Sequence, residues 1–170
     1  LAELHSRRIV HTQLRPGVVL LGHDDRSVWI TGFENALRLD TGTYTRQVRS
    51  EESLAYIAPE QTGRMETRVD NRTDLYSLGA ILYQMLTGKP PFETRDPLEL
   101  VHCHMARMPR VPSELDPVIP KPLSDIVMRL LMKKPAERYK SAQGVLADLR
   151  ECREQYRRTG RISELTLAVH

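Results

Sequence analysis

The sequence has 170 residues, of which 40% are hydrophobic and 28% charged, with a formal net charge of +3. This composition is typical of one globular domain with a substantial core, and it excludes an intrinsically disordered chain. The mild, mixed charge argues against nucleic-acid binding, no apolar run is as long as a membrane span, and two cysteines indicate a cytoplasmic rather than a disulfide-stabilised protein. Leu1 and Leu4 predict the tail of a helix at the start of the chain, and we expect the sequence to be a piece of a longer protein.

Two short apolar runs follow in the first third of the chain. Residues 18–21 and 28–30 flank the turn-forming sequence GHDDRS and predict a β-hairpin. Residues 37–53 are polar and have no hydrophobic periodicity, so we expect a long loop there.

Helical patterns dominate the rest of the chain. Residues 75–86 are apolar on nearly every side, which predicts a buried central helix capped by Thr73 or Asp74 and ended by Gly88. Apolar periodicity and capping residues predict three more helices, within residues 96–108, 123–133 and 141–152. We therefore expect a mainly α fold of the α+β class. Residues 1–152 form its folded unit, and residues 153–170 form a linker toward a following domain.

Four motifs in order carry a family resemblance. They are YIAPE at 56–60, DLYSLG at 74–79, TGKPPF at 87–92 and PAERY at 135–139. Together they resemble the larger, helical C-terminal lobe of a eukaryotic-type Ser/Thr protein kinase. The resemblance covers about residues 1–152 and implies a helical lobe with a small β-hairpin near the catalytic loop, while the small lobe is missing from this sequence.

The sequences PEQTGRM, DPLELVHCHMAR and ERYKSAQGVLADLREC resemble one bacterial subgroup more closely. In that subgroup a kinase-like domain stands at the front of very large cytoplasmic signalling proteins. An ATPase module and sensor domains follow it, often with a histidine kinase of the two-component type. The resemblance implies that the partners are the kinase small lobe and the ATPase module of the same polypeptide, together with other signalling proteins.

The stretch HTQLRPGV aligns with the kinase catalytic loop, H-R-D-L-K-P-x-N. His11 matches the His, Gln13 the catalytic Asp, Arg15 the Lys and Val18 the metal-binding Asn, while Gly32 matches the metal-binding Asp of the D-F-G triplet. A neutral amide at position 13 cannot accept the substrate proton. Valine and glycine offer no side-chain oxygen to Mg²⁺, which prefers oxygen ligands. These three changes predict that phosphoryl transfer is lost, and no cofactor or metal is expected.

Residues of structural importance in the family are retained. Glu60 and Arg138 match a buried ion pair that ties the activation segment to the late helices. Asp74 matches an aspartate that holds the catalytic loop's backbone, although it could instead be a plain helix N-cap. His11 matches a packing and hydrogen-bonding histidine.

Three functions from different classes remain open at this point. The first is a pseudokinase, a regulatory or interaction module without catalysis. The second is a weakly active, ATP-dependent Ser/Thr kinase that uses Glu34 as a displaced Mg²⁺ ligand or works by a metal-independent route. Asp24 and Asp25 also lie nearby in sequence, but they are better explained as turn-forming. The third is a structural helical spacer. A zinc site at His102–Cys103–His104 is not expected, since consecutive helical residues point in different directions.

Overall fold

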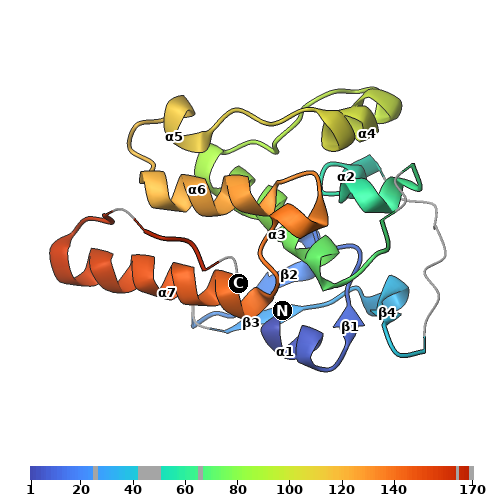
Figure 1. Ribbon diagram of the computed structural model, residues 1–170, viewed down its shortest axis with the longest axis horizontal. Coiled ribbons are helices and arrows are strands. Elements are labelled where there is room, and N and C mark those ends of the chain that lie inside the picture. The colour runs from blue at the N-terminus through green and yellow to red at the C-terminus, as the bar shows by residue number, and fades with distance from the viewer. Residues whose placement is uncertain (25–26, 42–50, 65–66, 164, 169–170) are drawn as a thin grey trace.

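The computed structural model describes residues 1–24, 27–41, 51–64, 67–163 and 165–168 (Figure 1). Over these residues the fold is mainly α, as predicted. The helices are Ala2–Ser6 (α1), Glu51–Leu54 (α2), Asn71–Thr87 (α3), Pro97–Ala106 (α4), Pro112–Leu115 (α5), Lys121–Leu130 (α6) and Ala142–Thr159 (α7). The strands are Ile9–Val10 (β1), Val19–Leu21 (β2), Val28–Ile30 (β3) and Leu37–Arg38 (β4).

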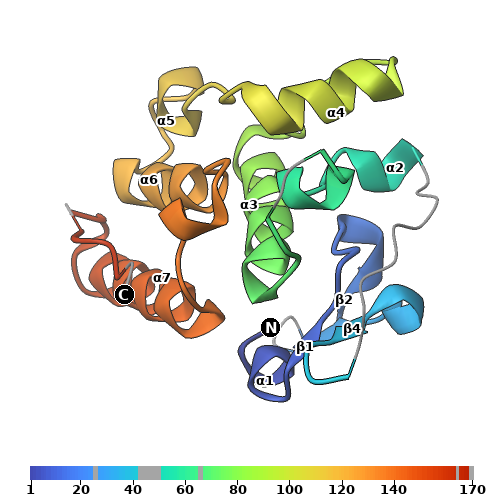
Figure 2. The same ribbon diagram turned by 45° about the vertical axis from the view of Figure 1, so that its right-hand side comes forward.

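The helix α3 is the predicted central helix, and it lies between α6 and the strands (Figures 1 and 2). The prediction that Thr73 or Asp74 caps it is wrong. Asp70 is the N-cap residue, and its side chain accepts a hydrogen bond from the backbone N–H of Arg72 at 2.8 Å. The first turn is polar, so apolar periodicity alone placed the start of the helix too late. Gly88 ends α3, as predicted.

Hydrophobic residues pack on both sides of α3. One cluster joins it to the catalytic-loop region through Leu14 and Val18, and the other joins it to α6 and α7 through side chains such as Leu130 and Val145. Gly79 permits the close approach of α3 and α6, because a Cβ there would lie 2.7 Å from Cβ of Leu130. The central helix is therefore packed on both sides.

Two pairs of short antiparallel strands occur in the described part of the chain. The β2–β3 hairpin confirms the prediction, with Val19 opposite Ile30 and Leu21 opposite Val28. The β1–β4 pair was not predicted, because each strand is only two residues long and shows no periodicity. Its second strand occupies the start of the predicted loop 37–53, α2 occupies the end, and residues 42–50 lie outside the described residues.

The last helix and the tail differ from the expected boundary at residue 152. Ser141 caps α7, as predicted, but the helix continues to Thr159. Beyond it, Ile162, Leu165 and Leu167 pack against the cluster of α6 and α7. The described residues between 153 and 168 are thus partly helical and partly packed on the core, and a linking role for 153–170 stays a prediction.

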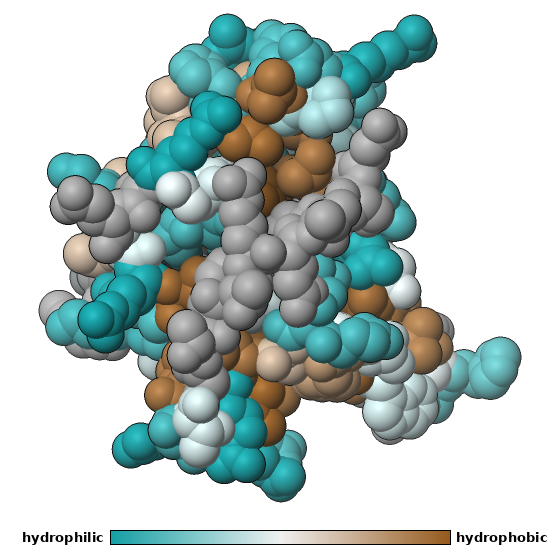
Figure 3. All heavy atoms as spheres, turned by 90° about the vertical axis from the view of Figure 1, so that its right-hand side faces the viewer, coloured by the Kyte–Doolittle hydropathy of each residue, from teal (hydrophilic) through white to brown (hydrophobic). Residues whose placement is uncertain are grey.

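The surface combines polar and apolar areas. On the face that carries α2 and β4, hydrophobic side chains lie in separate patches among hydrophilic ones (Figure 3). The β2–β3 hairpin exposes Leu21, Val28 and Trp29. None of the helices in the described residues combines the length and apolar character needed to cross a membrane.

Candidate active site

Asp74 of α3 fixes the backbone of the loop between β1 and β2. The buried Asp74 carboxylate accepts hydrogen bonds from the backbone N–H groups of His11 and Thr12, each at 2.8 Å. It also contacts Nε2 of His5 on α1 at 2.9 Å. Asp70 caps the helix, so Asp74 holds the loop's backbone instead of serving as a plain N-cap. The sequence interpretation did not find His5, which stands 69 residues from its partner.

His11 connects this loop to the segment after β3. Its Nδ1 accepts a hydrogen bond from the backbone N–H of Gln13 at 3.3 Å, so Nε2 carries the proton and donates to the Thr31 carbonyl at 2.7 Å. The His11 ring also packs edge-on against Phe33, with ring centroids 5.0 Å apart. The buried His11 is therefore occupied by packing and hydrogen bonding.

Gln13 and Arg15 replace the catalytic Asp and Lys in the alignment. The side chain of Gln13 is half-buried. It carries an amide at the position that the alignment gives to the catalytic base. Nε of Arg15 lies 3.6 Å from Oε2 of Glu52 on α2, which is an ion pair longer than a hydrogen bond. Arg15 thereby ties the loop to α2.

Val18 and Gly32, the two residues that the sequence alignment places at metal-ligand positions, lie against each other. Val18 is buried in the core cluster, and Gly32 has a left-handed backbone with φ of +77°. The backbone N–H of Thr31 donates to the Val18 carbonyl at 2.9 Å, which fixes the two segments side by side. An aliphatic side chain and a glycine supply no oxygen for Mg²⁺, so these residues do not fit the metal.

The residues considered as substitute carboxylates are placed differently. Asp24 accepts hydrogen bonds from the backbone and hydroxyl of Ser27 at 3.0 and 2.9 Å, so it shapes the hairpin turn. Asp25 lies outside the described residues. Glu34 is exposed, and its Oε2 lies 3.7 Å from the position a Cβ would take at Gly32. No group of three or more potential metal ligands occurs among the residues that the structure describes.

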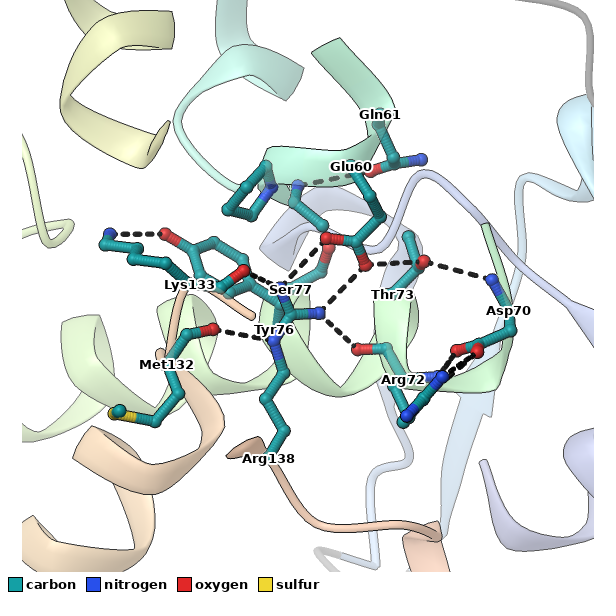
Figure 4. A network of polar contacts seen from close by, with 12 residues as sticks. Glu60, Gln61, Asp70, Arg72, Thr73, Tyr76, Ser77, Met132, Lys133 and Arg138 are labelled. Atoms are coloured by element: carbon teal, nitrogen blue, oxygen red, sulfur yellow. Dashed lines mark hydrogen bonds and ion pairs between the residues drawn. The ribbon is translucent and has the colours of Figure 1, made fainter. Parts of the chain in front are cut away.

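A buried ion pair joins the segment before α3 to the segment before α7 (Figure 4). Arg138 is 1% exposed and makes two hydrogen bonds to the Glu60 carboxylate, at 2.8 and 2.9 Å. Its remaining N–H groups donate to the carbonyls of Arg72, Met132 and Lys133 at 2.7–3.0 Å. All five guanidinium N–H groups are therefore used.

The ion pair continues into the catalytic-loop region. The hydroxyl of Thr73 on α3 donates to Oε1 of Glu60 at 2.8 Å. Next to Glu60, Nε2 of Gln61 donates to the carbonyl of Thr12 at 2.7 Å. This network links the end of the activation-segment motif, α3 and the loop.

A second buried polar group, missed from the sequence, lies beside Arg138. The hydroxyl of Tyr76 contacts Nδ1 of His104 at 3.0 Å and accepts a hydrogen bond from Nζ of Lys133 at 3.2 Å. Burial lowers the pKa of His104 to about 3 and that of Lys133 to about 8. The guanidinium of Arg138 stacks 4.8 Å from the Tyr76 ring centroid. The sequence drew attention to His104 only as part of the His102–Cys103–His104 cluster. No pattern in the sequence pairs it with Tyr76.

Comparisons with known proteins find relatives along most of the chain. The chain is 33% identical over 152 residues to a probable serine/threonine-protein kinase of Clostridium acetobutylicum, covering 89% of this chain and 23% of that protein. It is 35% identical over 147 residues to the serine/threonine-protein kinase PknB of Mycolicibacterium smegmatis, covering 85% and 23%. Over 94 residues it is 47% identical to hybrid signal transduction histidine kinase G of Dictyostelium discoideum, covering 55% of this chain and 3% of that protein.

The chain therefore spans less than a quarter of the length of each of these relatives. A family model described as the protein kinase domain matches residues 1–148. This match takes in the catalytic-loop region, the Asp74 contacts and the Glu60–Arg138 pair. The chain belongs to the protein kinase domain family.

Proposed function

We propose that the chain is the C-terminal lobe of a pseudokinase, a regulatory or interaction module in a bacterial-type signalling protein that has lost phosphoryl transfer. One observation carries the proposal. Gln13 and Val18 stand at the positions of the base and of one metal ligand, in a loop whose supporting contacts to Asp74 and Gln61 are present. Gly32, after β3, stands at the position of the other metal ligand.

The chemistry of these three positions supports the loss. Phosphoryl transfer needs a group that orients the attacking hydroxyl and takes its proton, and metal ions that neutralise the phosphate charge. The Gln13 amide can orient a hydroxyl by hydrogen bonding, but it is not a base at any ordinary pH. Val18 and Gly32 leave Mg²⁺ without the two side-chain ligands that kinases supply.

The proposed partners are other domains of the same polypeptide, namely the kinase small lobe and an ATPase module, and further signalling proteins. The similarity to a hybrid signal transduction histidine kinase supports this setting. We place the protein in the cytoplasm, because Cys103 and Cys152 are both buried free thiols.

A weakly active kinase is the second candidate, and one observation favours it. Oε2 of Glu34 lies 3.7 Å from the position that a Cβ would take at Gly32. A single exposed carboxylate is a poor Mg²⁺ site, since the ion is usually held by one or two carboxylates together with substrate phosphates and waters in octahedral geometry. We rank this function below the pseudokinase for that reason.

The full-length protein, including its small lobe, provides the test. Transfer of label from γ-³²P-ATP in the presence of Mg²⁺ is measured for the wild type, Glu34→Ala and Glu34→Gln. We expect no transfer from any of them. Mg²⁺-dependent transfer by the wild type that both Glu34 variants lose would establish the active kinase instead.

The third candidate is a structural spacer, and a deletion experiment in cells distinguishes it from a pseudokinase. Deleting residues 1–152 from the full-length protein should change the signalling output if the domain regulates. If the deletion lowers only the amount of folded protein and leaves the output per molecule unchanged, the domain is a spacer.

A further inference from the structure

We propose that Val18 and Gly32 form a steric lock, in which the Val18 side chain occupies the space that any side chain at position 32 would need. The two former metal-ligand positions are then coupled, because an aspartate cannot be restored at position 32 while the Val18 side chain is in place. The inference rests on the proposed function only in identifying the two positions as former ligands, since the contact itself does not depend on catalysis.

The geometry of the contact carries the first step. A Cβ built on Gly32 would lie 2.8 Å from Cγ1 and 3.5 Å from Cβ of Val18. Two non-bonded carbon atoms are favourable at about 3.5–4.0 Å, so the first distance is a clash. Even an alanine at position 32 would therefore require Val18 to move.

Val18 has little freedom to move. It is 4% exposed and packs in the same cluster as Leu14 and Ile30. Its carbonyl accepts hydrogen bonds from the backbone N–H and the hydroxyl of Thr31, and its N–H donates to the Arg15 carbonyl at 3.1 Å. A β-branched side chain has one rotatable bond and two γ carbons, so turning one methyl away brings the other toward a neighbour.

The backbone of Gly32 is a separate obstacle that can be measured on its own. Its φ of +77° lies in the left-handed region, which every residue with a Cβ adopts at some cost. Gly88 has nearly the same φ, +79°, but a Cβ there would meet nothing within 4 Å. Gly88 is therefore a control with the same left-handed φ and no steric contact, at a ψ of −5° where Gly32 has 46°.

A double-mutant cycle separates the two effects. The urea midpoint of this domain is followed in the full-length protein, by hydrogen exchange of peptides from the domain. Gly32→Ala, Val18→Ala and the double variant are compared, with Gly88→Ala as the strain control. We expect Gly32→Ala to lower the midpoint well beyond Gly88→Ala in the wild type. In the Val18→Ala background its shift should fall to that of Gly88→Ala.

Equal shifts of Gly32→Ala in both backgrounds would overturn the lock, and so would equal shifts of Gly32→Ala and Gly88→Ala in the wild type. These outcomes do not bear on catalysis. Phosphoryl transfer by the wild type would defeat the proposed function and leave the lock in place.

The lock also predicts how metal affinity changes when the ligands are restored. Asparagine has a single γ atom and can turn it away from residue 32, so Val18→Asn should open the space that Gly32→Asp needs. With Mn²⁺ and ATP as the probe, we expect the full-length Val18→Asn/Gly32→Asp variant to bind Mn²⁺ at least tenfold more tightly than Gly32→Asp alone. Equal affinity in the two variants would overturn the inference.

Discussion

Two parts of this fold differ in their chemistry. One is the polar network around Arg138, and the other is the apolar contact between Val18 and Gly32, called the corner below. Around Arg138, every N–H of a buried cation has an acceptor, and the Glu60 carboxylate is held from α3 as well. At the corner, an aliphatic side chain and a glycine lie against each other, at the positions that we propose correspond to the amide and carboxylate metal ligands of a protein kinase.

The difference separates folding from chemistry. Removing one partner of a buried ion pair leaves an uncompensated charge in the interior, so losing either Glu60 or Arg138 would destabilise the fold. A metal ligand stabilises a ligand-bound state and contributes nothing to the packed core. Val18 adds apolar contacts to the core cluster instead. In the proposed pseudokinase, the loop keeps the contacts that shape it and lacks the groups that act on phosphate.

The largest expected effect comes from the buried ion pair. Arg138→Leu leaves the Glu60 carboxylate buried without its partner, and we expect the free energy of unfolding to fall by about 3–5 kcal/mol. Lys89→Ala, which breaks the exposed pair with Glu93, is the control and should cost less than about 0.5 kcal/mol. Urea unfolding of the domain measures both. Equal effects would contradict the structural role given to Arg138.

The second-largest loss of stability is expected when Asp74 is replaced. Asp74→Ala leaves the buried N–H groups of His11 and Thr12 without an acceptor, so we expect a loss of about 2–4 kcal/mol. Asp70→Ala removes the N-cap of α3 and the partly exposed ion pair with Arg72, and should cost about 1–2 kcal/mol. The same urea measurement compares them. A larger loss for Asp70→Ala would mean that the helix cap matters more than the loop contact.

The buried histidine should make the domain sensitive to acid. Because burial lowers the pKa of His104 from its ordinary 6.5 to about 3, the unfolded chain binds a proton between these pH values and the folded chain does not. Stability contributed by neutral His104 is therefore present above pH 6.5 and lost as the pH falls toward 3, by about 2–3 kcal/mol at pH 4.5.

His104→Asn keeps an acceptor for the Tyr76 hydroxyl but does not titrate, so its stability should depend less on pH over this range. His102, exposed on the same helix, provides the matched variant His102→Asn. Unfolding free energies at pH 7 and 4.5 decide the matter. If His104→Asn and the wild type show the same slope, His104 is not the acid-sensitive group.

The smallest effect concerns the tail. Asp148 accepts hydrogen bonds from the Tyr139 hydroxyl at 2.6 Å and from the backbone N–H of Ala168 at 2.9 Å. Asp148→Ala should cost about 1–2 kcal/mol and expose the tail amides to hydrogen exchange. The exposed Glu154→Ala is a control on the same helix and should change neither quantity. Unchanged exchange of the tail in Asp148→Ala would show that Asp148 does not hold it.

Local patterns in the sequence predicted those parts of the fold that depend on local signals. The two short apolar runs on either side of the turn sequence GHDDRS predicted the hairpin, the longer apolar run predicted α3, and Ser141 predicted the start of α7. The start of α3 was placed too late because its first turn is polar, and α7 was ended too early because its last residues are highly charged.

Long-range pairings could not be predicted from spacing. The β1–β4 ladder joins strands of two residues each, and the Glu60–Arg138 pair spans 78 positions and was expected only from the family resemblance. The His5–Asp74 contact and the close approach of Val18 to Gly32 depend on how the loop folds over α3. A single sequence contains no signal for either.

The most direct test of the central claim is to restore the lost groups on the unchanged scaffold. Transfer from γ-³²P-ATP with Mg²⁺ is measured for the full-length Gln13→Asp/Val18→Asn/Gly32→Asp variant, beside the wild type. If the scaffold is that of a kinase and only the chemistry is missing, the variant should exceed the wild type by roughly 10²-fold or more. A folded variant with no transfer, or a wild type that is already as active, would contradict the account.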